Sequence, residues 1–284
     1  MAWAGLNYGT YYLVLLTLQK DCQMRYGICS VSLMPVRAKA DHRAEMVNQL
    51  LFGETFSILE AGQKWYYIRG ILDGYEGWVS KPQCTLLDEA LPESYHDQEY
   101  VVPDLMRIRQ ADTPGDSMMI LPGSSLPGLK QTTGEFSLGG TEYIVDGEIM
   151  RDTNPNKRDR ISRTATRFLN APYLWGGRSL YGIDCSGFVQ VVYKICGIVL
   201  PRDAGQQVKK GKAINFVSES GPGDLAFFGE TDEEISHVGI ILEGGRIIHA
   251  SGRVRIDKFD HQGIFSTGEN EYSHALRVIH NYLA

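Results

Sequence analysis

Cys185 has the sequence setting of a nucleophilic thiol. Asp184 stands where a helix N-cap belongs, and Gly197 stands where a C-terminal cap belongs. The predicted helix between them carries apolar residues at spacings i, i+3, i+4 and i+7, namely Phe188, Val191, Val192 and Ile195. A helix N-terminus favours a thiolate over a thiol, and its free N–H groups can hold a developing oxyanion. We therefore interpret Cys185 as a nucleophile; the alternative, a small buried structural thiol, suits Cys196 better.

A cysteine nucleophile needs a base, and two histidines could supply the base and a group that orients it. His237 and His249 lie in segments 236–242 and 246–251, which read as the two strands of a hairpin. In the predicted roles Cys185 attacks, His237 accepts its proton, and His249 orients His237. A lone histidine is more often a half-buried polar residue, but two that face each other favour the catalytic interpretation.

The register of this hairpin decides whether the two histidines can cooperate. A two-residue turn at Gly244 and Gly245 would place His237 and His249 on opposite faces of the sheet. A three-residue loop centred on Glu243 would instead pair His237 directly with His249 on one face, with Gly244 in the left-handed conformation. We predict the second register.

Zinc binding is the alternative use of these three side chains, because thiolate and imidazole are usual zinc ligands. No two of them have the close spacing of a ligand pair, so we predict neither a metal site nor a cofactor. The remaining histidines have no partner pattern and are expected at the surface: His42, His96, His261, His274 and His280.

The composition is that of a folded domain protein rather than a nucleic-acid binder. The chain has 284 residues, 43% hydrophobic and 22% charged, with a formal net charge of -6 and no basic stripe. Its 5 cysteines are an odd number, so at least one thiol is unpaired within the chain. Residues 1–25 contain an apolar run, Tyr11 to Leu18, that is too short to span a bilayer. We interpret 1–25 as a leader or signal remnant, and we favour an exported protein over a cytoplasmic one.

The elements that position the candidate site fall into an α+β domain preceded by β structure. Residues 26–90 and 91–150 each contain short β-branched and aromatic runs separated by Gly and Pro turns, which predicts two small all-β barrels. Residues 151–160 are polar and charged, as in a linker. Residues 161–284 are predicted to begin with a helix and to continue as an α+β catalytic domain.

Six motifs in the last part of the chain resemble those of the NlpC-type cell-wall peptidases, which have a papain-like fold and a Cys-His-His triad. The resemblance covers about residues 160–284 and implies the same fold and triad here. The motifs occur in the order 173–177, Asp184 to Phe188, Pro201 to Asp203, 223–228, 237–240 and 249–251.

The N-terminal barrels sharpen this resemblance toward one subgroup, the γ-D-glutamyl-L-diamino acid endopeptidases, or dipeptidyl-peptidases VI, which carry bacterial SH3-type domains. These enzymes cut free muropeptides after L-Ala-γ-D-Glu and require a free N-terminal alanine. The resemblance implies that Asp203 binds the substrate ammonium and that Tyr173 lies near the scissile carbonyl. A carboxylate in a closed pocket would select a free amine over an acylated one. The subgroup often has a serine after the Arg-Asp pair, where this chain has Ala204.

The same resemblance assigns further substrate-binding residues. Asp184 and Ser186 flank the nucleophile, and Glu54 and Tyr75 of the first barrel match segments that close the pocket. The bland alternatives are that Asp203 is only a helix N-cap and that Tyr75 belongs to the barrel core.

The sequence therefore predicts a monomeric cysteine peptidase that takes a small muropeptide, with no nucleic acid and no membrane span. The alternatives are an endopeptidase or amidase acting on polymeric wall, and a wall-binding protein. Whether L-lysine or meso-diaminopimelate follows the scissile bond is not decided by these residues.

Overall fold

The computed structural model describes residues 25–87, 100–113, 115–149, 154–231, 234–268 and 270–283. The expected leader, residues 1–25, lies outside the described residues except for its last position. Among the described residues, no helix is both long enough and apolar enough to cross a bilayer.

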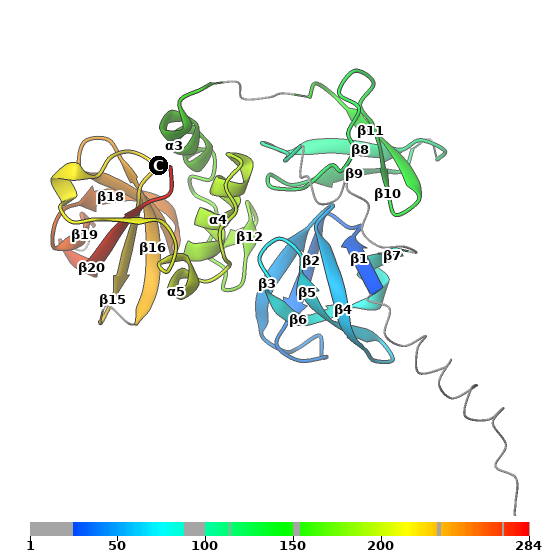
Figure 1. The fold of residues 1–284 in the computed structure, drawn as a ribbon, viewed down its shortest axis with the longest axis horizontal. Coiled ribbons are helices and arrows are strands. Elements are labelled where there is room, and N and C mark those ends of the chain that lie inside the picture. Colours follow the sequence, from blue (N-terminus) through cyan, green and yellow to red (C-terminus); the bar gives the residue numbers. More distant parts are fainter. Residues whose placement is uncertain are drawn as a thin grey trace, which may run out of the picture.

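The first β region is a strongly curled sheet with the strand order β3-β2-β6-β5-β4-β1-β7. Buried side chains of alternate strand positions form its core, including Met34, Phe56, Ile68 and Val79. It is drawn in blue to cyan in Figure 1. Its strands are β1 (Arg25–Cys29), β2 (Leu33–Arg37), β3 (Met46–Leu51), β4 (Thr55–Ala61), β5 (Trp65–Gly70), β6 (Glu76–Ser80) and β7 (Cys84–Leu87), with a 3-10 turn, η1 (Lys81–Gln83), before the last.

The second β region is a four-stranded antiparallel sheet ordered β10-β11-β8-β9. Its core continues into the first region, because Ile28 and Phe52 pack in one cluster with Phe136 and Tyr143. The expectation of a second SH3-type barrel at 91–150 stays a prediction. The strands are β8 (Met106–Gln110), β9 (Ser117–Ile120), β10 (Glu135–Leu138) and β11 (Thr141–Asp146).

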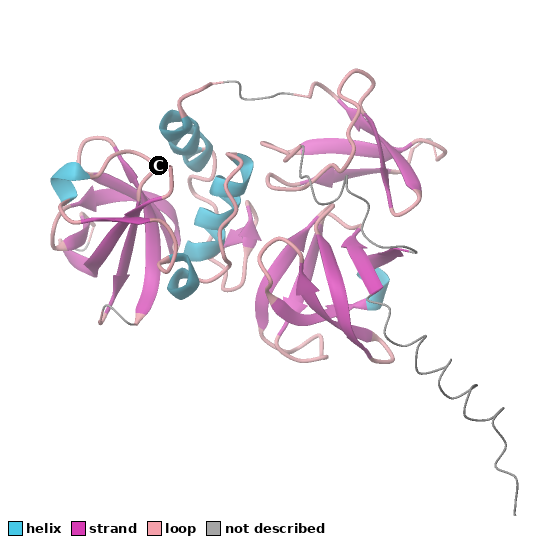
Figure 2. Cartoon of the chain, in the orientation of Figure 1, coloured by secondary structure: helices cyan, strands magenta, loops and turns pink. Residues whose placement is uncertain are grey.

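The C-terminal region is a second curled sheet with helices packed on one side. Its strand order is β14-β20-β15-β16-β17-β18-β19, and an additional pairing of β20 with β19 closes it. Figure 2 shows the α-helices, as distinct from the short 3-10 turns, lying between this sheet and the N-terminal β regions. The elements are α3 (Lys157–Thr166), β12 (Arg178–Ser179), β13 (Gly182–Ile183), α4 (Cys185–Ile195), α5 (Ala204–Gln207), β14 (Lys212–Ile214), η2 (Val217–Glu219), β15 (Leu225–Gly229), β16 (Ile235–Leu242), β17 (Arg246–Ser251), β18 (Arg253–Phe259), β19 (Gly263–Ser266) and β20 (Glu271–Asn281).

Helix α3 begins four residues before the expected start at Ile161, inside the segment read as a linker. The helix starts earlier because Asn156, a polar residue of the expected linker, is its N-cap. The side chain of Asn156 accepts hydrogen bonds from the backbone N–H groups of Arg158 and Asp159.

Helix α4 is the central element of the C-terminal region, with every residue from Cys185 to Lys194 buried. It packs against β16 and β17 of the closed sheet and against α3. A helix that is buried all round is held by its neighbours rather than by solvent. Residues at its N-terminus are therefore fixed in position relative to both sheets.

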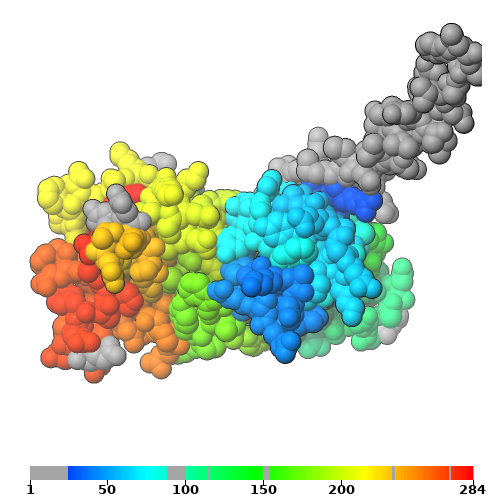
Figure 3. All heavy atoms as spheres, turned by 90° about the horizontal axis from the view of Figure 1, so that it is seen from below, coloured from blue at the N-terminus to red at the C-terminus, as the bar shows by residue number. Residues whose placement is uncertain are grey.

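The first β region contacts α4 through buried ion pairs. Glu54, 3% exposed, accepts hydrogen bonds from Arg178 at 2.7 and 2.9 Å and from Lys194 at 2.6 Å. Lys194 also donates to the carbonyl of Gly123 in the second β region. Side chains of the three regions form a continuous surface in Figure 3.

Candidate active site

Cys185 occupies the first position of α4, as the sequence predicts. The side chain of Asp184 caps the helix by accepting from the N–H of Gly187 at 2.7 Å. Gly197 follows the C-cap with φ of 81°, the left-handed conformation that ends such helices. The Cys185 side chain is buried, and its Sγ lies 3.9 Å from the carbonyl oxygen of Ser236, the residue before His237.

The resting thiol of Cys185 is not the lowered-pKa thiolate that its helix position suggests. Burial, followed by the charge of Asp184, raises the pKa of Cys185 to about 11. The helix N-terminus acts in the opposite direction but does not outweigh burial here. Cys185 is therefore protonated at neutral pH, and its activation requires a base.

The hairpin that carries the two histidines does not have the predicted register. Strands β16 and β17 pair His249 with Gly239, not with His237, so the loop is centred on Gly244 rather than on Glu243. The predicted direct pairing of His237 with His249 is therefore wrong, because the loop lies one residue later in the chain than predicted. Both Gly244 and Gly245 have positive φ, which only a loop starting one residue later can use.

His237 and His249 nevertheless lie on the same face of the sheet. His249 pairs two residues beyond His237, and a shift of two positions preserves the face. The Nε2 atom of His237 lies 2.9 Å from the Nδ1 atom of His249. The predicted contact is therefore made diagonally across the ladder instead of directly.

Asp257 of β18 extends this pair into a chain of three groups. Its Oδ2 lies 3.0 Å from the Nε2 atom of His249. A carboxylate can only accept, so His249 carries its proton on Nε2 and its Nδ1 accepts from the Nε2–H of His237. This leaves the Nδ1 atom of His237 without a proton. Burial and the neighbouring histidines hold the pKa of His237 well below its usual range, so it is neutral.

His274 of β20 is part of the same cluster, contrary to the expectation that it lies at the surface. Its ring stacks on that of His237 with centroids 4.1 Å apart and an angle of 27° between the planes. Burial and the charge of His249 lower the pKa of His274 to about 4. A neutral ring therefore covers one face of His237.

A cavity of about 370 Å³ opens above Cys185. The first β region supplies Val47 and Tyr75 to its wall, and the C-terminal region supplies the remainder: Trp175, Asp184, Cys185, Ser186, Arg202, Asp203, Ala204, Gly205, Ile235 and Ser236. The Nε1–H of Trp175 donates to Glu45, so a further carboxylate of the first region holds the cavity wall. The cavity is thus built at the junction of two regions of the chain.

Asp203 lies in this cavity as a half-buried carboxylate. It occupies the N-cap position of α5, but its side chain makes no capping hydrogen bond. Burial, with the charges of Asp184 and Asp73, raises the pKa of Asp203. The capping alternative is therefore not supported by the geometry, and the carboxylate is available to a ligand.

Asp184, by contrast, is fully engaged with the protein. Arg202 donates to both of its oxygens, at 3.0 and 2.5 Å, and the N–H of Gly176 donates to Oδ2 at 2.8 Å. Arg202 also donates to Ser186 at 2.9 Å and to Asn48 of the first β region at 2.8 Å. Asp184 and Ser186 line the cavity as parts of this network, and their predicted contact with substrate stays a prediction.

Of the two first-barrel residues predicted for the site, Tyr75 and Glu54, the structure places only one at the cavity. Tyr75 lines the cavity, and burial with the charge of Asp203 raises its pKa to about 12. Glu54 lies instead at the buried contact with Arg178 and Lys194. The prediction that Glu54 closes the pocket is therefore corrected: Glu54 does not line the cavity, and two cations already neutralise its carboxylate.

Tyr173 lies close enough to Cys185 for the two side chains to interact electrostatically, and its place near a scissile carbonyl stays a prediction. Burial, followed by the charges of Cys185 and Asp184, raises the pKa of Tyr173 to about 12. The phenol is therefore protonated and can donate a hydrogen bond at neutral pH. Its side chain is 37% exposed, so a substrate can reach it.

The sequence analysis missed three residues of the site: Arg202, Asp257 and His274. Arg202 stands in a quoted motif, but nothing in the motif shows that its partner is Asp184. Asp257 alternates with apolar residues in a strand, a pattern shared by any half-exposed strand residue. His274 belongs to β20, 25 residues from His249 and 37 from His237 along the chain. The roles of Asp257 and His274 depend on strand pairing, and that of Arg202 depends on a contact with Asp184, 18 residues away. Local patterns encode neither.

The site does not have the make-up of a metal centre. Within the described part of the chain, no group of three or more His, Cys, Asp or Glu side chains is arranged to hold a metal ion. His249 uses its two ring nitrogens on His237 and Asp257. The geometry is that of a thiol nucleophile, a neutral imidazole and an orienting imidazole, which defines a cysteine-type hydrolase.

Comparisons with known proteins agree with this class. The model of the NlpC/P60 family matches residues 170–268, and that of the bacterial dipeptidyl-peptidase Sh3 domain matches residues 36–83. The gamma-D-glutamyl-L-lysine dipeptidyl-peptidase of Bacillus subtilis is 31% identical over 216 residues, which cover 71% of this chain and 71% of that protein. Dipeptidyl-peptidase 6 of Lysinibacillus sphaericus is 25% identical over 249 residues, covering 79% of this chain and 88% of that protein.

Solved structures show the same arrangement of regions. The crystal structure of an NlpC/P60 family protein from Bacillus cereus superposes with a TM-score of 0.73 at 21% identity, covering 91% of this chain and 100% of that one. This chain belongs to the NlpC/P60 family, with a papain-like catalytic domain and an N-terminal SH3-type domain.

Proposed function

We propose that this protein hydrolyses the γ-D-glutamyl–L-diamino acid bond of free muropeptides that begin with L-Ala, releasing L-Ala-D-Glu. The observation that carries the proposal is the position of Asp203, a half-buried carboxylate without a capping role, in the same cavity as Cys185. The relative named gamma-D-glutamyl-L-lysine dipeptidyl-peptidase supports the choice of bond.

The reaction begins with transfer of the Cys185 proton to the free Nδ1 atom of His237. The sulfur attacks the γ-carbonyl of D-Glu, and unpaired N–H groups in the first turn of α4 stabilise the oxyanion. The tetrahedral intermediate collapses, and the departing amine of the diamino acid takes the proton from His237. Water, deprotonated by His237, then hydrolyses the thioester and releases the dipeptide with Cys185 restored as a thiol.

His249 and Asp257 position His237 for both proton transfers. Asp257 fixes the tautomer of His249, and His249 fixes the tautomer of His237. When His237 accepts the proton of Cys185, the imidazolium is stabilised by this chain of hydrogen bonds, which ends in a carboxylate. His249 thus acts through His237 and not on the substrate.

We infer that the cavity recognises the N-terminal end of the substrate. Asp203 pairs with the ammonium of L-Ala, Tyr75 closes the cavity from the SH3-type domain, and Tyr173 donates toward the scissile carbonyl. Asp184 and Ser186 contribute by fixing the first turn of α4 through Arg202. Ala204 offers no hydroxyl, so the ammonium depends more heavily on Asp203.

The proposed organisation keeps residues 91–150 as a second SH3-type domain and the catalytic domain at the C-terminus, in a monomer, with the connection shortened to the residues before α3, which starts at Lys157. The SH3-type domain at 26–90 restricts the length of the peptide on the acyl side of the bond, because its residues wall the cavity. A closed cavity of this kind suits a short free peptide better than polymeric wall.

The test is hydrolysis of L-Ala-γ-D-Glu-L-Lys with a free and with an acetylated N-terminus, measured as kcat/KM. The free peptide should be cut about 100-fold faster, because the acetylated form leaves the half-buried carboxylate of Asp203 unpaired. Equal rates would contradict the role of Asp203. Cys185→Ala should abolish cleavage, and retained activity would contradict the mechanism itself.

A further inference from the structure

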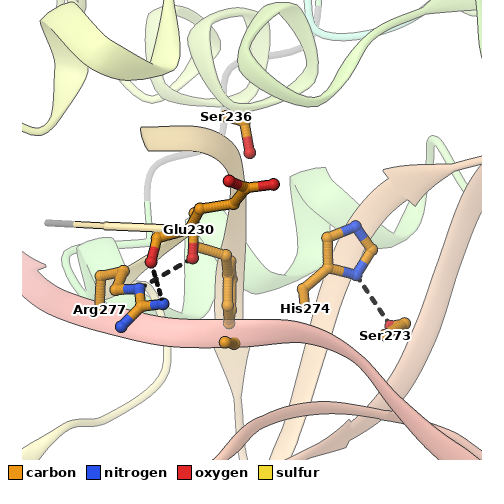
Figure 4. Close-up of a pocket in the computed structure, with 8 residues that line it drawn as sticks. Glu230, Ser236, Ser273, His274 and Arg277 are labelled. Atoms are coloured by element: carbon orange, nitrogen blue, oxygen red, sulfur yellow. Dashed lines mark hydrogen bonds between the residues drawn. The ribbon is translucent and has the colours of Figure 1, made fainter. Parts of the chain in front are cut away.

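A second cavity lies on the other side of the catalytic histidine. It has a volume of about 480 Å³ and is lined by Phe228, Gly229, Glu230, Ser236, Ser273, His274, Ala275 and Arg277. Figure 4 shows these side chains, with the carboxylate of Glu230 extending toward Ser236 between Arg277 and His274. None of the mechanistic steps above uses its charged residues.

The position of this cavity relates it directly to the scissile bond. Ser236 lines both cavities, and the next residue is His237. His274, in the wall of the second cavity, stacks on His237. Because the two cavities adjoin at Ser236, a peptide with its N-terminus on Asp203 and its γ-carbonyl at Cys185 reaches the second cavity if its leaving-group side continues past Ser236.

The ionisable side chains that line the second cavity differ in whether a ligand can reach them. The guanidinium of Arg277 donates through Nε to the carbonyl of Gly229 at 2.8 Å and through Nη2 to the carbonyl of Glu230. These bonds fix the backbone that carries Glu230. Ser273 is bonded to the Nδ1 atom of His274, and burial makes His274 neutral at neutral pH. The carboxylate of Glu230, exposed in the cavity, is the anionic group that a ligand can reach.

We propose that this cavity receives the L-diamino acid released by the reaction, and that Glu230 pairs with the ammonium on its side chain, with Arg277 as the residue that positions Glu230. The inference rests on the proposed function and adds the group that recognises the far side of the bond. A side-chain ammonium is common to L-lysine and meso-diaminopimelate, and an apolar residue of equal length lacks it. Ala275 and the ring of His274, which packs edge-to-face on the buried Phe228, line the cavity where the methylene stem would lie.

The experiment compares kcat/KM for L-Ala-γ-D-Glu-L-Lys, the corresponding meso-diaminopimelate peptide and the L-norleucine peptide. An exposed ion pair predicts that the wild-type enzyme prefers lysine over norleucine by about fivefold. In Glu230→Gln this preference should fall to about one, with the same loss for the diaminopimelate peptide. Glu230→Asp retains the carboxylate and should keep part of the preference. Glu243→Gln, an exposed glutamate on the hairpin loop, is the matched control and should keep all of it.

The outcomes separate the two proposals. If the wild-type enzyme cuts the lysine and norleucine peptides equally well, the role of Glu230 is wrong while the proposed function stands. If Glu230→Gln keeps the full preference, the ammonium is bound elsewhere and the inference is likewise wrong. If none of the three peptides is cut, the proposed function itself fails.

Discussion

The SH3-type domain meets the catalytic domain at two carboxylates that have opposite surroundings. Glu54 is buried between Arg178 and Lys194, with all three contacts between 2.6 and 2.9 Å. Asp203, at the cavity beside the same domain, makes no capping bond and has a raised pKa. The charges of Arg178 and Lys194 outweigh burial and lower the pKa of Glu54 to about 2. A neutralised carboxylate holds domains together, whereas one without a counter-ion is suited to a ligand.

Arg202 is close enough for its charge to act on Asp203 and oppose the rise in the pKa of Asp203, but the guanidinium makes its hydrogen bonds to other groups. It is the chain neighbour of Asp203, yet its Nε, Nη1 and Nη2 atoms donate to Asn48, Ser186 and Asp184. A guanidinium has its donors in a fixed planar fork, so these partners determine its direction. The nearest positive charge is thus committed to the helix cap, and the ammonium of a substrate can take its place beside Asp203.

The largest effect expected from this comparison is on stability. Glu54→Gln leaves Arg178 and Lys194 buried without a counter-charge, which should lower the free energy of unfolding by about 3–5 kcal/mol. Chemical denaturation followed by tryptophan fluorescence measures it. Glu243→Gln, an exposed glutamate, should change stability by less than about 0.5 kcal/mol. If the two variants were equally stable, the ion-pair cluster would not hold the domains together.

The second effect concerns catalysis at the other carboxylate. Asp203→Asn should lower kcat/KM for a free-amine peptide by about 100-fold, because the ammonium loses its only proposed counter-charge. It should also remove the difference between free and acetylated peptides. Asp112→Asn, at an exposed position of the second β region, is the matched control and should leave both values unchanged.

Stability should respond to Asp203→Asn in the direction opposite to Glu54→Gln. A raised pKa in the folded state means that ionised Asp203 costs stability above that pKa. Removing the charge should therefore leave the free energy of unfolding unchanged or slightly higher at neutral pH. A large loss of stability in Asp203→Asn would show that this carboxylate is structural, and the contrast with Glu54 would fail.

Acid should separate the two carboxylates in the wild-type protein. The pKa of Glu54 falls from its ordinary value of 4.5 to about 2 on folding, so its contribution to stability is present above pH 4.5 and is lost between pH 4.5 and 2. Asp203 titrates above its ordinary value of 3.8, so ammonium binding weakens first as the pH falls. KM for the free-amine peptide should rise at a pH where circular dichroism shows the fold intact. Glu54→Gln should make the loss of stability between pH 4.5 and 2 smaller by the share that Glu54 contributes.

The parts of the site that lie along one helix were predictable, and the parts that depend on strand pairing were not. Asp184, Cys185 and Gly197 occupy the predicted cap and first-turn positions because caps are encoded by adjacent residues. The hairpin was predicted one residue out of place, since Gly244 and Gly245 allow more than one loop. The shared face of the histidines survived the error because the side-chain period of a strand is two.

The role of Glu54 could not be predicted for a different reason, namely that its partners are distant along the chain. A segment resembling those that close the pocket placed it in the site, but the structure pairs it with Arg178 and Lys194, which are 124 and 140 residues away along the chain. No local pattern distinguishes a carboxylate that meets two cations from one that meets none. That distinction is also the one on which the proposed ligand-binding role of Asp203 rests.

The smallest expected effect tests how far the SH3-type domain contributes to the cavity. Burial and the charge of Asp203 raise the pKa of Tyr75 to about 12, so its hydroxyl stays protonated and can donate to a peptide. Tyr75→Phe should lower kcat/KM for the free-amine peptide by about threefold to tenfold, the value of one hydrogen bond. Tyr67→Phe removes a hydroxyl bonded to Glu76 on the same domain and should leave kcat/KM unchanged.

The ratio of kcat/KM for the free peptide to that for the acetylated peptide distinguishes two roles for Tyr75. If Tyr75 acts only as a wall, its phenylalanine variant retains the wall and both peptides keep their rates. If the hydroxyl helps to hold the ammonium end in place, only the free peptide loses rate, as in Asp203→Asn but to a smaller degree. An equal loss for both peptides would contradict the proposed role of the SH3-type domain. It would show that the domain supports catalysis in general rather than recognising the N-terminus of the substrate.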